Sequence, residues 1–151
     1  MGFPPPATPM TQVDFYILKN QLDQGMELLT CKLAEKAYLK GHYVYIHTAN
    51  SAQSQQLDDL LWTFRENSFV PHCQLLNDED QAKVMIGHDR EPPLEFDVLI
   101  NLVEQVPLFF SRFLRVAEIV GSDEQQKQQA RTRFRFYRDR GYPLKSHEIT
   151  L

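Results

Sequence analysis

The sequence has few of the residues that build disulfide frameworks or metal sites. Its 151 residues include only two cysteines, Cys31 and Cys73, which are too few and too far apart for a zinc motif or a network of disulfides. His72 precedes Cys73, but no second pair of ligands follows at metal-binding spacing. The sequence therefore predicts two reduced thiols and no metal site.

Glycine is also scarce, and its spacing excludes the common phosphate-binding loops. The six glycines are scattered along the chain at Gly2, Gly25, Gly41, Gly87, Gly121 and Gly141. They form neither a G-x-G-x-x-G fingerprint nor a P-loop, the two glycine-rich loops that hold phosphates. A G-x-S-x-G nucleophile elbow is missing as well. We therefore expect no cofactor and no enzyme activity.

Long hydrophobic runs and an excess of positive charge are both missing. No apolar stretch approaches the roughly 20 residues that span a bilayer, and the first residues do not resemble a signal peptide. The net charge of −4 argues against a chain that binds nucleic acid over its whole surface. We expect a cytoplasmic protein that does not associate with membranes.

The first residues differ from the rest of the chain. Residues 1–12 contain four prolines and no hydrophobic periodicity, which is typical of a disordered tail. Met10 is a possible alternative start, because regular patterning begins at Val13. We expect one domain over residues 13–151, a length that buries a sizeable core.

Strand and helix patterns alternate along this domain. Strands are expected at residues 13–18, 43–47, 83–86, 96–102 and 118–120, with a weaker one at 74–76. Helices are expected at residues 25–40, 51–64 and 107–116, and after Ser122. This alternation favours a single three-layer α/β domain with a mostly parallel sheet.

The helix after Ser122 has signals at both ends. Ser122 and Gln125 have the spacing of a capping box, in which Ser122 is the N-cap. Gly141 stands where a helix commonly ends in a left-handed residue. One stripe of this helix combines cations with an aromatic ring, at Lys127, Arg131, Phe134 and Arg138, and Ala130 and Tyr137 lie beside it.

Such a stripe suits a ligand that is both anionic and apolar. Residues 127–145 hold seven Lys or Arg and one Asp, so the positive charge is local. A small cationic patch on an acidic protein fits a peptide carboxylate or an acidic tail better than a long row of phosphates. Two alternatives stay open, a solvated helix face and a surface that binds nucleic acid.

A second candidate surface is aromatic. Trp62, Phe64 and Phe69 cluster around a short polar loop near the end of the second expected helix. Aromatic side chains at a surface loop commonly anchor a protein partner, whereas the same residues can also belong to the core. The sequence alone leaves both interpretations open.

Several runs together resemble the family of chi subunits of bacterial DNA polymerase III. Two of them are fairly specific, SFVPH at 68–72 and ARTRFRFYRDRGYPL at 130–144. The others are DFYIL at 14–18, LAEKAYLKGHYVYI at 33–46, LDDLLWTF at 57–64 and DVLINL at 97–102. The resemblance implies a Rossmann-like α/β domain without a nucleotide, a cofactor or catalysis.

The resemblance also implies a role in replication as a bridge between two partners. One partner is the psi subunit of the clamp loader, and the other is the acidic C-terminal tail of single-stranded DNA-binding protein. DNA would then be contacted only indirectly. The rival functions are direct nucleic-acid binding through the basic helix and nucleotide-handling catalysis on a Rossmann-like fold.

The resemblance assigns residues to both candidate surfaces. The tail site would comprise Val120, Lys127, Arg131, Phe134, Tyr137 and Gly141. Arg131 would bind the terminal carboxylate, Lys127 would meet acidic residues upstream, and Val120 and Phe134 would line a pocket for the phenylalanine of the tail. Phe134 occupies a position where tyrosine is equally typical. Trp62 and Phe69 would contact psi.

Overall fold

Seven parallel strands form one sheet in the computed structural model, which describes residues 10–77, 80–92 and 96–151. Their spatial order is β3-β4-β2-β5-β6-β1-β7, and every neighbouring pair is parallel. The strands are β1 (Gln12–Leu18), β2 (Val44–Thr48), β3 (His72–Gln74), β4 (Val84–His88), β5 (Val98–Asn101), β6 (Arg115–Val120) and β7 (Leu144–Ile149).

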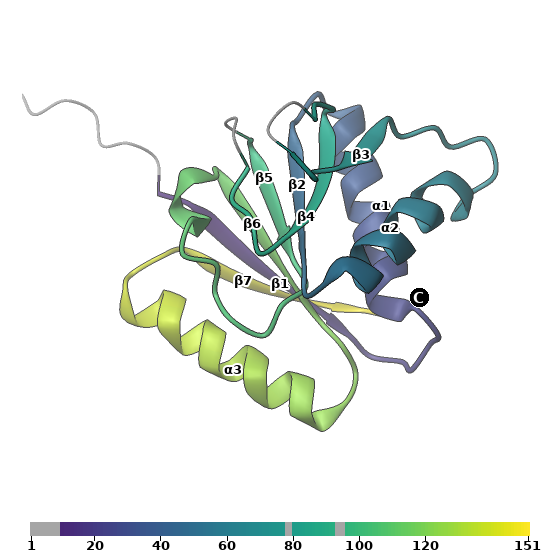
Figure 1. The fold of residues 1–151 in the computed structure, drawn as a ribbon. Helices are drawn as coiled ribbons and strands as arrows, with labels where there is room; N and C mark the ends of the chain where they lie inside the picture. Colours follow the sequence, from purple (N-terminus) through teal and green to yellow (C-terminus); the bar gives the residue numbers. More distant parts are fainter. Residues whose placement is uncertain (1–9, 78–79, 93–95) are drawn as a thin grey trace, which may run out of the picture.

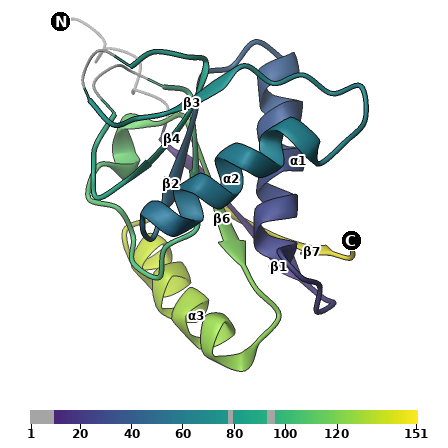
Figure 2. The same cartoon turned by 45° about the vertical axis from the view of Figure 1, so that its right-hand side comes forward.

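Helices cover both faces of this sheet. α1 (Gly25–Leu39) and α2 (Ser51–Thr63) lie on one face, and α3 (Glu124–Asp139) lies on the other (Figure 1). In the turned view of Figure 2, α1 and α2 lie together and α3 lies below them. The expected three-layer α/β domain with a parallel sheet is confirmed.

Two apolar layers follow from the period-two alternation of the strands. On β2, Ile46 points into the layer beneath α1 and α2, whereas Tyr45 points into the layer beneath α3. Leu57 and Leu61 bring α2 onto the first layer. Phe15 belongs to the second layer, which packs against α3. Because both faces are buried, the central strands read as nearly continuous apolar runs.

The prediction of a helix over residues 107–116 is wrong. This stretch contains only a 3₁₀ turn, Phe110–Arg112, and then enters β6. Phe110 and Phe113 are buried beneath α3, and their spacing of three residues imitates a helical face. Pairing with β1 and β5 on its two sides fixes β6 as a strand and overrides this local pattern.

The sequence also missed β7. This strand forms the sheet edge beside β1, and four of its six residues, Lys145 to Glu148, are polar. An edge strand beside solvent needs little apolar character, so its sequence carries a weak strand signal. The helix after Ser122 is therefore followed by a strand that completes the sheet.

The first strand begins close to the position expected from the sequence. β1 starts at Gln12, one residue before Val13, and the buried Thr11 hydroxyl donates to the carbonyl of Phe113 at 2.7 Å. The remainder of the expected tail, residues 1–9, lies outside the described residues.

The prediction of a capping box with Ser122 as the N-cap is also wrong. α3 begins one residue later, and the Asp123 carboxylate accepts from the backbone N–H of Gln126 at 2.7 Å. Asp is as good an N-cap as Ser, so the competing cap is Asp123. Gly141 has the expected left-handed φ of 80° after the end of α3.

Candidate functional site

A buried polar cluster holds α3 against the sheet. The Glu118 carboxylate on β6 accepts from Arg133 Nε at 2.9 Å and from the Tyr137 hydroxyl at 2.7 Å, both on α3. Asn101 on β5 donates to the same carboxylate at 2.9 Å. All four side chains are buried. Because two of these directional bonds come from α3, they fix which face of the helix is turned outward.

Burial governs the electrostatics of this cluster. It raises the pKa of the Glu118 carboxyl, although Arg133, Tyr137 and Asn101 act in the opposite direction. Burial, followed by the neighbouring Glu118, also raises the pKa of the Tyr137 hydroxyl, which therefore remains a donor. Burying the ion pair of Glu118 and Arg133 costs solvation free energy, and the hydrogen bonds to the Glu118 carboxylate offset that cost.

An open pocket of about 260 Å³ lies between α3 and the β1–β7 edge of the sheet. We call it the tail pocket. Its apolar lining comes from three elements, with Phe15 and Ile17 on β1, Val120 on β6, and Ala130 and Phe134 on α3. Its polar lining consists of Lys19, Lys127, Arg131, Ser146 and Glu148. An apolar floor with a cationic rim suits a ligand with an apolar tip and a negative charge.

Two aromatic rings form the floor of the tail pocket. The ring centroids of Phe15 and Phe134 are 5.4 Å apart, with an interplanar angle of 59°. Phe15 is buried, and Phe134 is half-buried and faces the pocket from α3. A ring backed by a second ring is a firm wall for an apolar side chain.

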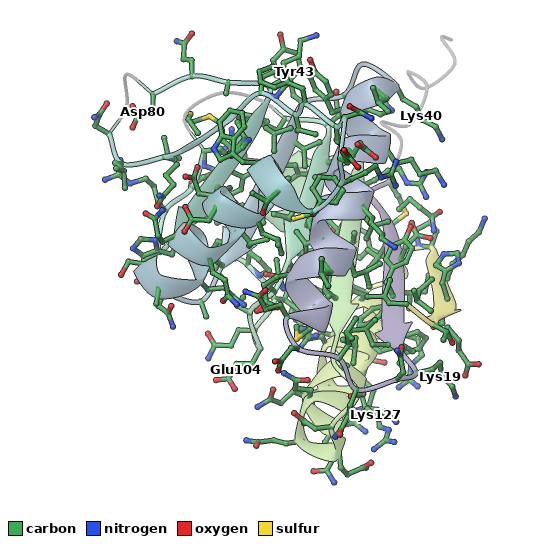
Figure 3. All side chains as sticks on the ribbon, turned by 90° about the vertical axis from the view of Figure 1, so that its right-hand side faces the viewer. Lys19, Lys40, Tyr43, Asp80, Glu104 and Lys127 are labelled. Atoms are coloured by element: carbon green, nitrogen blue, oxygen red, sulfur yellow. The ribbon has the colours of Figure 1, made fainter. Side chains whose placement is uncertain are left out.

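The cations at the rim are accessible. Arg131 Nη1 lies 3.3 Å from Glu124 Oε1, but the Arg131 side chain is 60% exposed. Lys19 and Glu148 form a similar exposed pair at 3.5 Å. Exposed pairs of this kind contribute about 0–1 kcal/mol, so a ligand carboxylate can replace Glu124 at little cost. Figure 3 labels Lys19, which directly follows β1, and Lys127 on α3; both line this pocket.

The structure brings together four of the six residues expected at the tail site. Val120, Lys127, Arg131 and Phe134 all line the tail pocket. Tyr137 does not, because it is fully buried and its hydroxyl is bound to Glu118. Gly141 does not line it either, since it lies beyond the end of α3.

The opposite wall of the tail pocket was missing from the sequence prediction. Phe15 and Ile17 share one face of β1, and the alternation in DFYIL was the available signal for that face. Ser146 and Glu148 come from β7, which the sequence did not predict.

The second candidate surface is exposed, which excludes the core interpretation for its two main residues. Trp62 is 49% exposed and Phe69 is 69% exposed, and their ring centroids are 5.6 Å apart. His72 supports Trp62 from beneath at a centroid distance of 4.3 Å. His72 is itself held by the carbonyls of Asp58 and Val70. We call Trp62 and Phe69 the aromatic patch.

The described part of the chain was searched for metal ligands, reactive thiols and membrane-spanning helices. Within it, no group of three His, Cys, Asp or Glu side chains is placed to hold a metal ion. Cys31 and Cys73 are free thiols, and burial raises the pKa of Cys31 to about 12. None of the helices in residues 10–77, 80–92 and 96–151 is long and apolar enough to cross a membrane.

These features define a class of protein: a Rossmann-like α/β domain with an exposed aromatic patch and a cationic pocket, and with no glycine-rich phosphate loop. The family model for the DNA polymerase III chi subunit, HolC, matches residues 10–145. The chain therefore belongs to the DNA polymerase III chi subunit family. It is an accessory, non-catalytic subunit with a role in DNA replication.

Curated relatives agree with this assignment. The chain is 42% identical over 140 residues to the DNA polymerase III subunit chi of Pseudomonas aeruginosa, which covers 93% of this chain and 98% of the relative. It is 30% identical over 142 residues to the DNA polymerase III subunit chi of Escherichia coli, which covers 89% and 96% respectively.

A solved structure shares the fold. The crystal structure of T4 UvsW superposes with a TM-score of 0.67 at 7% sequence identity, over 93% of this chain and 42% of that one. At this identity the likeness concerns the fold alone.

Proposed function

We propose that this subunit bridges the clamp loader, through psi, to the C-terminal tail of single-stranded DNA-binding protein. The observation that carries the proposal is the tail pocket, in which an apolar floor and three cations meet at one end of α3. The site of action is the cytoplasm, where a bacterial replication complex works.

The chemistry of the tail pocket fits a free peptide C-terminus. The Arg131 guanidinium offers a planar fork that can pair with a terminal carboxylate through two hydrogen bonds. Phe134 and Val120 surround the space for the last apolar side chain. Lys127 lies one turn before Arg131, has no ion-pair partner among the described residues, and can attract acidic residues upstream.

The aromatic patch fits the second partner. Trp and exposed aromatic neighbours are enriched among the residues that dominate protein interfaces. Trp62 and Phe69 lie at the far end of α2 and in the loop that follows, on the α1–α2 face of the sheet, whereas the tail pocket lies on the α3 face. Two partners can therefore bind at the same time.

The crevice in which such folds bind their ligands argues against the rival function, a nucleotide-handling enzyme. β1 and β6 are neighbours, and the helices that follow them cover opposite faces, so the ligand crevice of the fold lies at their carboxyl ends. The described residues lining it include Asp23 and Glu27 but no Lys or Arg. A Cβ on Gly121 would lie 1.6 Å from Gln126 Oε1, so this glycine makes room for Gln126.

A two-by-two calorimetric cycle tests the tail pocket. It combines wild type and Arg131→Ala with a tail peptide that ends in either a carboxylate or an amide. We expect Arg131→Ala to weaken the carboxylate peptide by roughly 1.5–3 kcal/mol, or about ten- to a hundred-fold. Amidation should then matter much less in the variant, because both changes delete the same interaction.

Arg138→Ala is the matched control for this cycle. Arg138 is an exposed arginine on the same helix, it pairs with Asp139, and it does not line the tail pocket. It should leave the affinity of both peptides unchanged within about two-fold. Additive losses from Arg131→Ala and amidation would overturn the proposed carboxylate contact.

A further inference from the structure

A second large cavity lies on the face of the sheet opposite the tail pocket. Its volume is about 450 Å³, and it runs between α1 and the neighbouring strands β5, β6, β1 and β7. We call it the basic groove. Its cations are Lys36 on α1, Lys40 directly after α1, Arg115 on β6 and Lys145 on β7. Figure 3 shows Lys40 at the end of α1 away from Lys19.

The charge of the basic groove is strongly positive although the whole chain is acidic. Its lining includes four Lys or Arg side chains and one carboxylate, Asp14. Asp14 is buried and already accepts from Arg115 Nη2 at 2.8 Å and from His147 Nε2 at 3.0 Å. His42, another lining residue, is paired with Asp97 at 3.4 Å. Anions are therefore attracted to this face.

The groove also contains a pair of stacked rings. The centroids of Tyr16 on β1 and His147 on β7 are 4.8 Å apart, and the two planes differ by 18°. Both side chains are half-buried on the surface of the sheet. Planar side chains on an open sheet face are the usual platform for unpaired bases, and the surrounding cations follow the phosphates.

We infer that the basic groove binds single-stranded nucleic acid, with a base on the Tyr16–His147 stack and phosphates against Lys36, Lys40, Arg115 and Lys145. The inference goes beyond the proposed bridge, which implies contact with DNA only through another protein. An acidic peptide would use the cations equally well but would leave the stacked rings without a partner.

The two sites share the same pair of strands. Phe15 and Ile17 face the tail pocket, whereas Asp14 and Tyr16 face the basic groove. β7 alternates in the same way. A peptide tail and a nucleic-acid strand can therefore lie on opposite sides of one sheet edge without competing.

Fluorescence anisotropy with a labelled oligothymidylate of about 15 nucleotides tests the inference. With about four phosphate contacts, the affinity should fall about fifty-fold between about 50 mM and about 200 mM salt. Binding that is absent at low salt, or that ignores salt, would overturn the inference.

Two charge-reversal variants locate the binding. Lys40→Glu with Lys145→Glu should weaken the oligothymidylate at least ten-fold while the affinity for the tail peptide is kept. Lys127→Glu with Arg131→Glu makes the same change of charge at the tail pocket and should leave the oligothymidylate affinity within about three-fold. Equal losses in both variants, or a loss only in the second, would place the binding on the general surface or on α3 and overturn the groove.

The stacked rings give an independent readout. His147→Ala should weaken the single strand about five- to a hundred-fold, whereas His147→Phe keeps a ring and should restore most of the affinity. A duplex of the same length and a poly-glutamate peptide should both bind less tightly than the single strand. If either binds equally well, the stack takes no part and the inference fails. Thermal melts confirm that each variant is folded.

Discussion

The hydroxyl of Tyr137 acts on the tail pocket only through the position of α3, because it donates to Glu118 beneath the helix. Tyr137→Phe keeps the ring contacts with Phe15 and Phe110 but removes one donor from a buried carboxylate. We expect the free energy of unfolding to fall by about 1–3 kcal/mol. Tail-peptide affinity should stay within about two-fold, as urea denaturation and calorimetry can show.

Tyr142→Phe is the control for that substitution, since the Tyr142 hydroxyl has no hydrogen-bond partner among the described residues. It should change stability by less than about 0.5 kcal/mol. If Tyr137→Phe weakened the peptide and left stability intact, the hydroxyl would contact the ligand, and Tyr137 would belong to the tail site, where the family resemblance places it.

The aromatic patch supports a second prediction at the residue scale. Phe69→Ala should weaken psi binding by about 2–4 kcal/mol, because truncating an interface aromatic commonly costs that much. The melting temperature should hardly change, since Phe69 is 69% exposed. Co-purification with psi measures the first effect and calorimetric melting the second.

Leu108→Ala provides the matched control, because Leu108 is another exposed apolar residue, on the connection between β5 and β6. It should leave psi binding intact. Co-purification that survives both Trp62→Ala and Phe69→Ala would remove the aromatic patch as the psi surface. Unfolding of either variant would mean that the ring stabilises the fold although it is exposed.

The start of α3 allows a test at the scale of an element. Asp123→Ala should destabilise the protein by about 1 kcal/mol, because the side chain caps the backbone N–H of Gln126. Ser122→Ala, one residue earlier, should change stability by less than about 0.5 kcal/mol. Equilibrium unfolding of the two variants compares them directly, and the reverse order would restore the capping box at Ser122.

The elements also show which parts of the fold can be predicted from sequence. Central strands such as β2 carry buried side chains on both faces, and their apolar runs predicted them correctly. β7 could not be predicted, because a mostly polar edge strand is defined by its pairing with β1 and not by its composition. The apparent helix at 107–116 failed because the spacing of Phe110 and Phe113 serves the sheet core.

The residues of the tail pocket, too, could be predicted only in part from the sequence. Lys127, Arg131 and Phe134 share one stripe of a single helix, so helical periodicity alone predicted their grouping. Phe15 and Glu148 face them from β1 and β7, and only tertiary pairing brings these residues near α3. Tyr137 lies next to the stripe in helical projection, and the Glu118 beneath it decides that it is buried.

At the scale of the whole molecule, the first residues can be tested by deletion. Removal of residues 1–10 should leave the melting temperature and both binding activities unchanged. Removal of residues 1–12 should destabilise the protein, because it deletes the buried Thr11 hydroxyl bond and the hydrogen bond from Gln12 N to the Leu114 carbonyl. A loss of several degrees in the shorter deletion would show that the prolines stabilise the domain.

The position of β1 between β6 and β7 has a consequence during synthesis. Gln12 pairs with Arg115 and Val13 pairs with Leu144, so the first strand to leave the ribosome waits for the last two. At about 5–20 residues per second, that delay lasts about 5–25 seconds. The nascent chain therefore carries an apolar strand without neighbours for that time, which makes it a natural client for chaperones that bind extended apolar segments.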